Sequence, residues 1–309
     1  MFEFDPVVLL AVILVNVVIA YSQSVVLKSG VFSVATIGLV AVGAYITGYF
    51  VVMRHWAAWP SAVVGVLGSV VFAALLALPI SRLRGTYAAI ASLAFVIIVQ
   101  TAAQNFTSFT GGANGLDGIP RVIDWPGLLV VAVVCVLVLT AVYRSGLGVR
   151  FDMVRQDERV AVSQGVSVAR THFTAFLLSG LFAGIGGACY AFYNYALFPD
   201  NFSFTIVTNV LAYVYLGGYR SWRGPLLGAV VVTALPEIFL SLQGWTLIVD
   251  GGILIVIVAL LPAGVLDSLE LAVRRRRSHR GPGATPGGSA GDKVPAVSGA
   301  GQRIAGQPS

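Results

Sequence analysis

Charged residues are scarce in this sequence. They make up 10% of its 309 residues, whereas 57% are hydrophobic; a soluble domain carries about 25% charged residues. A chain this apolar cannot place its surface in water. The composition therefore excludes the soluble classes and predicts an integral membrane protein.

Cysteine and lysine are nearly absent. Cys135 and Cys189 both stand within apolar runs, so neither a disulfide nor a metal framework is expected. The two lysines, Lys28 and Lys293, do not follow the glycine-rich pattern that holds nucleotide phosphates. If ATP drives this protein, another subunit must bind the ATP, and we expect no cofactor on this chain.

Motifs for catalysis are also missing. His55, His172 and His279 lie far apart, and the sequence holds no paired carboxylates, no His-Glu-x-x-His and no Gly-x-Ser-x-Gly. An intramembrane enzyme would have few groups to work with. Glu237 and Asp250 are the main ionisable residues within apolar runs. A proton- or sodium-coupled carrier usually needs such groups near the midplane, so their scarcity argues against a secondary carrier without removing that alternative.

Apolar segments, in contrast, are abundant. A bilayer core about 30 Å thick is crossed by roughly 20 apolar residues in a helix. We therefore predict an all-α, polytopic transmembrane helix bundle of about nine spans. The spans lie near residues 7–27, 34–53, 57–80, 86–105, 127–143, 173–197, 204–218, 224–242 and 246–262. Gly30, Gly38, Gly43 and Gly48 leave open whether the second span is a short, broken or re-entrant helix.

Basic residues set the predicted orientation, with the N-terminus outside and the C-terminus inside. In this orientation Arg54 and Arg121 are the only basic residues of the outer loops. The inner loops collect Lys28, Arg82, Arg84, Arg144, Arg150, Arg155, Arg159, Arg170, Arg220 and Arg223. An extra hairpin within residues 20–45 would preserve this asymmetry. The acidic start, Met-Phe-Glu-Phe-Asp-Pro, is unlike the basic first region of a signal peptide, so a cleaved signal is not expected.

The end of the chain has a different composition. Residues 1–271 are expected to form the transmembrane domain, and residues 272–309 a basic and then disordered cytoplasmic tail. Residues 278–309 are rich in glycine, proline, alanine and serine and show no apolar period. The Arg274–Arg277 run is interpreted as a stop signal at anionic headgroups. A lipid or nucleic-acid site is the alternative to that interpretation, and we expect no nucleic-acid partner.

The longest inner loop, at about residues 144–171, contains a segment with helix signals. Asp157 and Glu158 favour a helix N-terminus, and Gly165 is a natural stop. Three residues at helical spacing form one small, weakly apolar face: Val160, Ala161 and Gln164. A solvated loop helix and a docking site for a cytosolic partner both fit this pattern.

Several blocks resemble one family of membrane proteins. Glu158-x-x-Ala161-x-x-x-Gly165 looks like the EAA-type coupling loop of ABC importer permeases. Further blocks are similar to the permeases of branched-chain amino acid importers, the LivM-like family. These blocks are Leu83-Arg-Gly-Thr-Tyr-Ala-Ala-Ile90, Thr110-Gly-Gly-Ala-Asn-Gly-Leu-Asp-Gly-Ile-Pro120, Leu216-Gly-Gly-Tyr-Arg-Ser-Trp-Arg-Gly-Pro-Leu-Leu-Gly228 and Leu235-Pro-Glu237. Their order and spacing fit the family across roughly residues 30–270.

The resemblance implies a non-catalytic, multi-pass permease subunit of a bacterial inner membrane, which moves branched-chain amino acids by alternating access. Its implied partners are two cytosolic ABC ATPases that hold ATP and magnesium, a second homologous permease, an extracytoplasmic substrate-binding protein and the lipid membrane. The residues that would couple it to the ATPases are Arg155, Asp157, Glu158, Ala161 and Gly165.

The chain departs from the family pattern at a few positions. The family's early Gly-His pair appears as Ala35-Thr36, and its upstream Asn as Gln23. In the fourth span, Ile97 and Gln100 stand where relatives often carry Glu and Arg. Polar groups along a path help to decide what passes. The alternative cargoes are therefore urea, short amides and other small amino acids, and a stand-alone secondary carrier or channel is the alternative class.

Six polar residues are candidates for the translocation path or for substrate contact: Ser33, Thr36, Gln100, Asn114, Asn209 and Glu237. Neutral polar groups in spans also hydrogen-bond neighbouring helices, which is the favoured interpretation of Gln100 and Asn209. The glycine-rich loop 110–120 either presents backbone N–H groups to a binding protein or substrate, or is a tight linker. Glu237 follows Pro236 and either caps locally or meets a substrate ammonium.

The sixth span carries overlapping small-xxx-small patterns, formed by Gly180, Ala183, Gly184, Gly187 and Ala188. Such patterns let helix backbones approach closely. Packing inside one subunit is favoured over a subunit interface.

Overall fold

The computed structural model of the chain describes residues 6–83 and 85–239, with side chains as far as residue 235 at the C-terminal limit. The predicted ninth span at 246–262, Asp250, the Arg274–Arg277 run and the tail lie outside the described residues.

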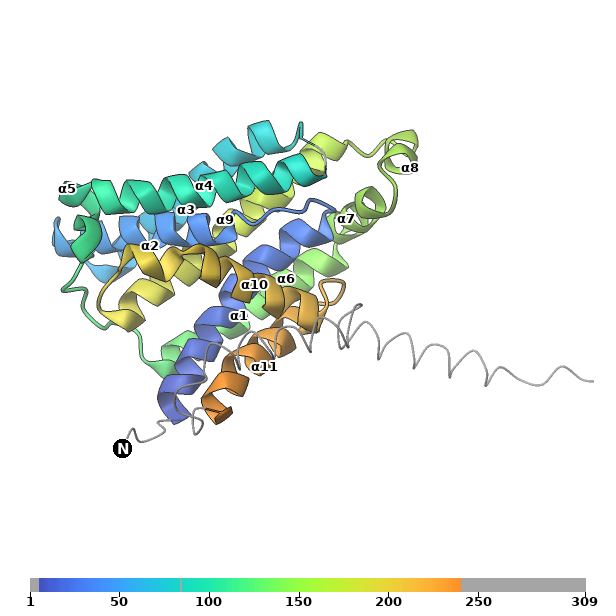
Figure 1. Cartoon of the computed structure of the whole chain (residues 1–309). Coiled ribbons are helices and arrows are strands. Elements are labelled where there is room, and N and C mark those ends of the chain that lie inside the picture. Colours follow the sequence, from blue (N-terminus) through green and yellow to red (C-terminus); the bar gives the residue numbers. More distant parts are fainter. Residues whose placement is uncertain (1–5, 84, 240–309) are drawn as a thin grey trace, which may run out of the picture.

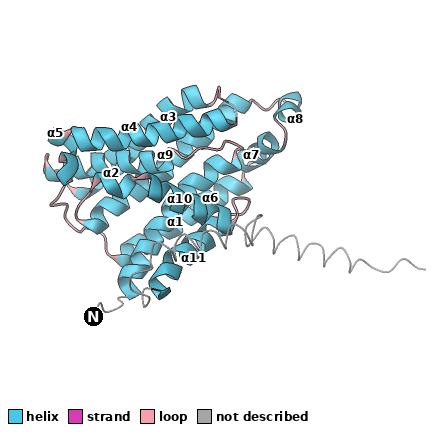
Figure 2. Cartoon of the chain, in the orientation of Figure 1, coloured by secondary structure: helices cyan, strands magenta, loops and turns pink. Residues whose placement is uncertain are grey.

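Helices make up the regular structure of the described residues (Figures 1 and 2). The α-helices are α1 (Pro6–Lys28), α2 (Thr36–Val52), α3 (Ala58–Ile80), α4 (Thr86–Asn105), α5 (Thr107–Thr110), α6 (Trp125–Arg144), α7 (Gly146–Gln156), α8 (Glu158–Ser163), α9 (Val168–Asn194), α10 (Phe204–Gly217) and α11 (Arg223–Phe239). Two 3₁₀ turns, η1 (Gly112–Asn114) and η2 (Pro199–Phe202), lie in loops. The all-α fold class is confirmed for this part of the chain.

The first eight predicted spans each coincide with a helix: α1, α2, α3, α4, α6, α9, α10 and α11. Among these, α1, α3, α4, α6 and α9 are long and apolar enough to cross a membrane, and α2 and α11 are shorter apolar helices. The chain therefore has the helices of a multi-pass membrane protein.

The second predicted span is a short helix, and it is not broken. α2 runs without interruption past Gly38, Gly43 and Gly48. The irregularity precedes it: residues 29–35 form a non-helical connection from α1, and Gly30 within it has φ +90°. The interpretations as a broken helix and as a hidden hairpin within residues 20–45 are therefore wrong, because α1, this connection and α2 account for the whole segment.

α9 lies at the centre of the bundle and packs against α1, α2 and α3 (Figure 1). Its glycines permit this close packing. A Cβ added to Gly184 would lie 2.7 Å from Val66 Cα of α3, and one on Gly187 would collide with the Val40 carbonyl oxygen of α2. At these positions the small-xxx-small patterns serve packing inside the chain, as favoured from the sequence.

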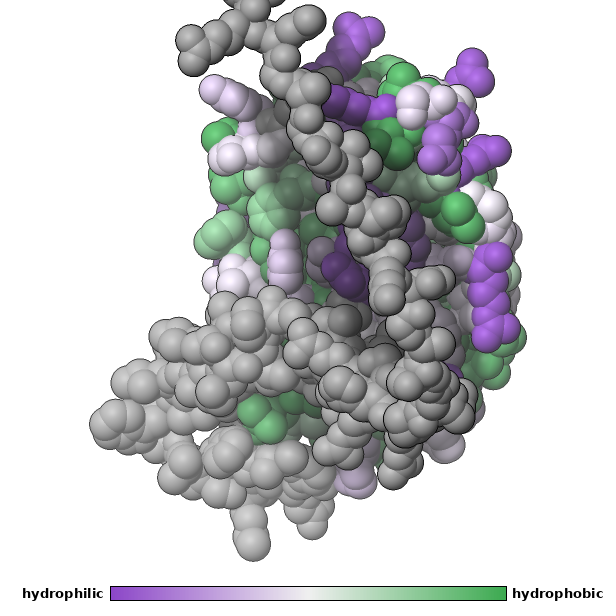
Figure 3. Space-filling view, turned by 90° about the vertical axis from the view of Figure 1, so that its right-hand side faces the viewer, coloured by the Kyte–Doolittle hydropathy of each residue, from purple (hydrophilic) through white to green (hydrophobic). Residues whose placement is uncertain are grey.

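The outward faces of α3, α4 and α6 are apolar. Leu67, Leu75, Ile98 and Leu137 are each more than half exposed, and continuous apolar surface of this kind needs lipid or another protein to cover it. The two ends of the bundle carry different loops. α5 lies at one end and α8 protrudes from the other (Figure 1). Hydrophilic side chains gather in the upper part of the view that faces the α8 end (Figure 3).

Candidate functional site

α8 is a short helix with well-defined ends. The Asp157 carboxylate accepts hydrogen bonds from Arg159 N at 2.7 Å and Val160 N at 3.2 Å, which caps the first turn. At the other end, Gly165 has φ +79° and its N–H donates to Val162 O. The predicted start and stop are both confirmed, because each depends on local chemistry.

The predicted apolar face of this helix is wrong. Ala161 is 1% exposed and faces the protein, whereas Val160 and Val162 are 52% and 59% exposed. Successive helical positions differ by about 100°, so residues 160 and 161 point in different directions. Gln164 is the C-cap residue and lies outside the helix. The outward apolar side chains of α8 are therefore the two valines.

The sequence did not predict α7, which directly precedes α8. Ser145 caps α7 by accepting a hydrogen bond from Leu147 N at 3.2 Å. Arg155 belongs to the last turn of α7, where its guanidinium lies 3.3 Å from the Asp152 carboxylate. Among the residues assigned to coupling, Arg155 and Ala161 thus point inward, while the exposed residues are Asp157, Glu158 and Gly165.

Two of the path candidates meet in a buried polar cluster. Gln23 Nε2 donates to Ser33 O at 2.6 Å, and Thr36 Oγ1 donates to Gln23 Oε1 at 2.5 Å. Val34 N donates to Ser92 Oγ of α4 at 2.9 Å. Gln23, Ser33, Thr36 and Ser92 are at most 3% exposed. In this conformation the cluster holds the 29–35 connection between α1, α2 and α4.

Gln23 and Ser92 were missed as members of this site. In the sequence, Gln23 stands out only as a departure from the family pattern. A neutral amide in an apolar helix is a usable signal, because in lipid such a group needs a partner.

The remaining path candidates do not join this cluster. Gln100 in α4 and Asn209 in α10 are half-buried, and Asn114 in η1 is exposed. The described side chains show no hydrogen bond from Gln100 to another helix. Glu237 lies in α11, but its side chain is outside the described residues.

The glycine-rich loop 110–120 is tied to the loop that follows α9. Leu116 and Leu197 exchange backbone hydrogen bonds of 2.9 and 3.0 Å, and Ile119 N donates to Tyr195 O. Arg121 Nη1 donates to the Tyr195 hydroxyl at 3.2 Å, and this bond raises the pKa of the guanidinium. The N–H groups of residues 116 and 119 are thus used inside the chain.

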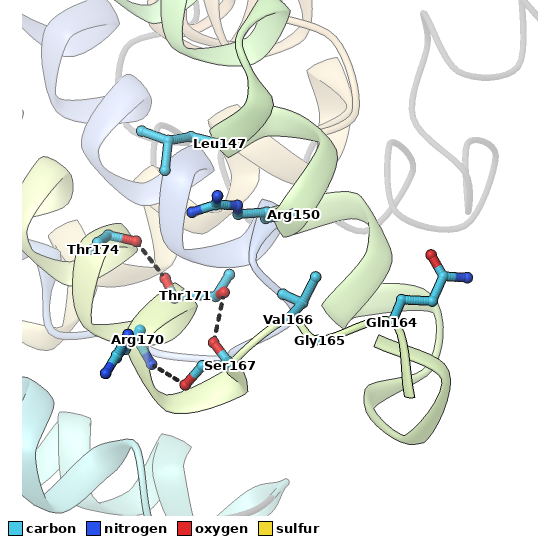
Figure 4. A pocket seen from close by; sticks show the side chains of 9 residues that line it. All are labelled: Leu147, Arg150, Gln164, Gly165, Val166, Ser167, Arg170, Thr171 and Thr174. Atoms are coloured by element: carbon cyan, nitrogen blue, oxygen red, sulfur yellow. Dashed lines mark hydrogen bonds between the residues drawn. The ribbon is translucent and has the colours of Figure 1, made fainter. Parts of the chain in front are cut away.

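Two cavities flank α8 at its junction with α9. One, of about 440 Å³, lies between α7 and α9; Figure 4 shows Leu147 and Arg150 facing Thr171 and Thr174. The other, of about 640 Å³, lies where the end of α3 approaches α8 and His172 of α9. Within the described part of the chain, no group of three or more His, Cys, Asp or Glu residues could hold a metal ion.

Comparisons with known proteins show which family this sequence matches. A family model described as "Branched-chain amino acid transport system / permease component" matches residues 6–258. The chain is similar to the high-affinity branched-chain amino acid transport system permease protein LivM of Salmonella typhimurium, with 28% identity over 288 residues. It is 29% identical over 288 residues to the protein of the same name in Escherichia coli. Each match covers 81% of this chain, and the chain spans 65% of the length of each relative.

Proposed function

Because the chain belongs to the family of branched-chain amino acid transport permease components, we propose that it is the membrane-spanning subunit of an ATP-driven importer for leucine, isoleucine and valine. The family match over residues 6–258 is the observation that carries this proposal. In this machine the chain is non-catalytic. The proposed partners are two cytosolic ATPases that bind ATP and magnesium, a second related permease and an extracytoplasmic binding protein.

The protruding α8 is the proposed contact with an ATPase. Val160 and Val162 give it exposed apolar side chains, and the Asp157 cap and Gly165 turn fix its two ends. ATP-driven closure of the ATPases would displace α8 and stabilise one of two arrangements of the spans. Alternating access follows when the two arrangements open to opposite sides.

The proposed topology has nine spans in a bacterial inner membrane, with the N-terminus outside and the C-terminus inside. Lys28 and Arg220 meet at the same end of the bundle as α7, which supports placing the basic loops together on the cytoplasmic side.

Leucine, isoleucine and valine are the proposed cargo because the spans carry little fixed charge, and a path of this kind suits a net-neutral solute. One departure from the family pattern lies away from the interior: Ile97 is 52% exposed on α4. Thr36 also departs from the family pattern, and it lies within the buried polar cluster. Because this departure changes an interior polar group, a related machine for urea or short amides is the second candidate.

Uptake into vesicles that hold the complete complex tests the cargo. Labelled leucine should enter in an ATP-dependent manner, and isoleucine and valine should compete with it, whereas urea, acetamide and acidic amino acids should not. Import of urea or acetamide without leucine import would replace the cargo assignment by the second candidate. Leucine uptake without any ATPase would favour a secondary carrier.

A further inference from the structure

α1 ends in a buried cation. Lys28 is 4% exposed, and lysine is almost never buried without a partner. Its Nζ lies 3.3 Å from Asp152 Oδ2 of α7 and donates to Arg220 O, between α10 and α11, at 2.9 Å. It also lies 4.3 Å from the ring centroid of Tyr143 in α6. One side chain therefore joins the end of α1 to three other parts of the bundle.

Asp152 is shared between two cations. Its second carboxylate oxygen lies 3.3 Å from Arg155 Nη2, and the Arg155 guanidinium lies 5.5 Å from the ring centroid of Tyr219. Asp152 is 38% exposed and Lys28 6% exposed, counted on side chains, so water screens the carboxylate more than the ammonium. If α7 moved away alone, Lys28 would remain buried without its counter-ion, which is unfavourable.

A backbone contact also connects the end of α1 to α7, independently of charge. Gly30 has φ +90°, and a Cβ at this position would lie 3.0 Å from Arg155 Cα. The turn that follows α1 thus touches the backbone of α7 at a position where glycine avoids both a strained conformation and a close contact.

The junction formed by Lys28, Asp152, Arg155 and Gly30 lies between α8 and the buried polar cluster. Only Asp157 separates α7 from α8, so a displacement of α8 acts directly on α7. On the other side, Gln23 lies on α1 within two turns of Lys28 and holds Ser33 and Thr36. A continuous set of contacts therefore leads from α8 through Asp152 and Lys28 to the 29–35 connection.

We propose that Lys28 and Asp152 are positioning residues for energy coupling, whose ion pair transmits the displacement of α8 to the connection between α1 and α2. This inference rests on the proposed function. Neither residue contacts substrate or ATP in this scheme. The pair keeps α1 and α7 moving as one unit, which is what coupling through a contiguous network requires.

The test is the number of ATP molecules hydrolysed per leucine imported by the complete complex in proteoliposomes. Lys28→Met and Asp152→Asn should each lower leucine uptake about fivefold while the assembled complex continues to hydrolyse ATP, so the ratio rises. The loss in the double variant should be clearly smaller than the product of the two single losses, because both variants remove the Lys28–Asp152 interaction. Arg144→Met is the control, since it removes an exposed cation from the end of α6 for which the described residues show no ion pair.

The amount of assembled complex and its melting temperature separate coupling from folding. If Lys28→Met does not assemble, Asp152→Asn carries the test, because it keeps the lysine with its Arg220 and Tyr143 contacts. An unchanged ratio in Asp152→Asn, or losses that multiply in the double variant, would overturn the inference. A wild-type complex without ATP-dependent leucine uptake would overturn the proposed function and this inference together.

Discussion

At the scale of single residues, Gly165 combines a left-handed backbone with empty surroundings. Its φ is +79°, and a Cβ would meet nothing within 4 Å. Since the added Cβ would meet no neighbouring atom, Gly165→Val would act mainly through backbone strain, by roughly 1–2 kcal/mol, and should move the end of α8. We expect leucine uptake to fall by roughly tenfold, the equivalent of that energy, while the protein still reaches the membrane.

Gly146→Val is a matched control for this change. Gly146 lies in the same segment between α6 and α9 and also has open space around it, but its φ is not positive. Uptake and copurification of the ATPases should persist in this variant. If they also persist in Gly165→Val, the α8 segment is only a solvated loop helix.

Thr36 is the second residue whose role can be isolated. Thr36→Val keeps the shape of the side chain but leaves Gln23 Oε1 buried without its donor, a loss of about 1–3 kcal/mol. The melting temperature in detergent should fall clearly. Thr140→Val is the control, because Thr140 bonds only the Val136 carbonyl of its own helix. Equal melting temperatures for the two variants would contradict a structural role for the cluster.

At the scale of elements, the packing of α9 depends more on Gly187, which faces α2, than on Gly186, which faces α1. A Cβ at Gly187 would meet backbone atoms of α2, whereas one at Gly186 would meet the Ile19 side chain at 3.0 Å. Gly187→Ala should destabilise the bundle by about 1–3 kcal/mol through overpacking, and Gly186→Ala by less, since a side chain can shift. Thermal unfolding in detergent measures both, and a reversed order would contradict this packing.

Elements governed by local chemistry were predictable from the sequence. The helices of the first eight predicted spans follow from apolar length, and α8 follows from the Asp157 cap and the Gly165 stop. α7 was not predicted, because its polar residues and two glycines show neither the length nor the apolar content of a span. The meeting of Lys28 with Asp152 could not be predicted, since the two residues lie 124 positions apart in the sequence and only the packing of the bundle brings them together.

At the scale of the whole molecule, the two ends of the bundle differ in chemistry. One end carries the 110–120 loop, bonded to the loop after α9 through Leu116 and Leu197. The other carries α7, α8 and the buried junction around Lys28. An importer of the proposed kind needs this asymmetry, because a binding protein docks on one side and ATPases on the other.

Cysteine labelling of intact cells tests which end faces outward. With Cys135 and Cys189 replaced, single cysteines at Arg54 and Arg121 should react with an impermeant maleimide, because these residues hold the basic positions of the predicted outer loops. Cysteines at Arg150 and Arg220 should react only after the membrane is permeabilised. Arg150 lies in α7, and the Arg220 carbonyl accepts a hydrogen bond from Lys28 at the same end of the bundle. Cysteines at these two positions must therefore be either both labelled or both protected in intact cells. Labelling of position 150 from outside intact cells would invert the topology and place α8 on the side where no ATP is available, which would remove the basis of the coupling proposal.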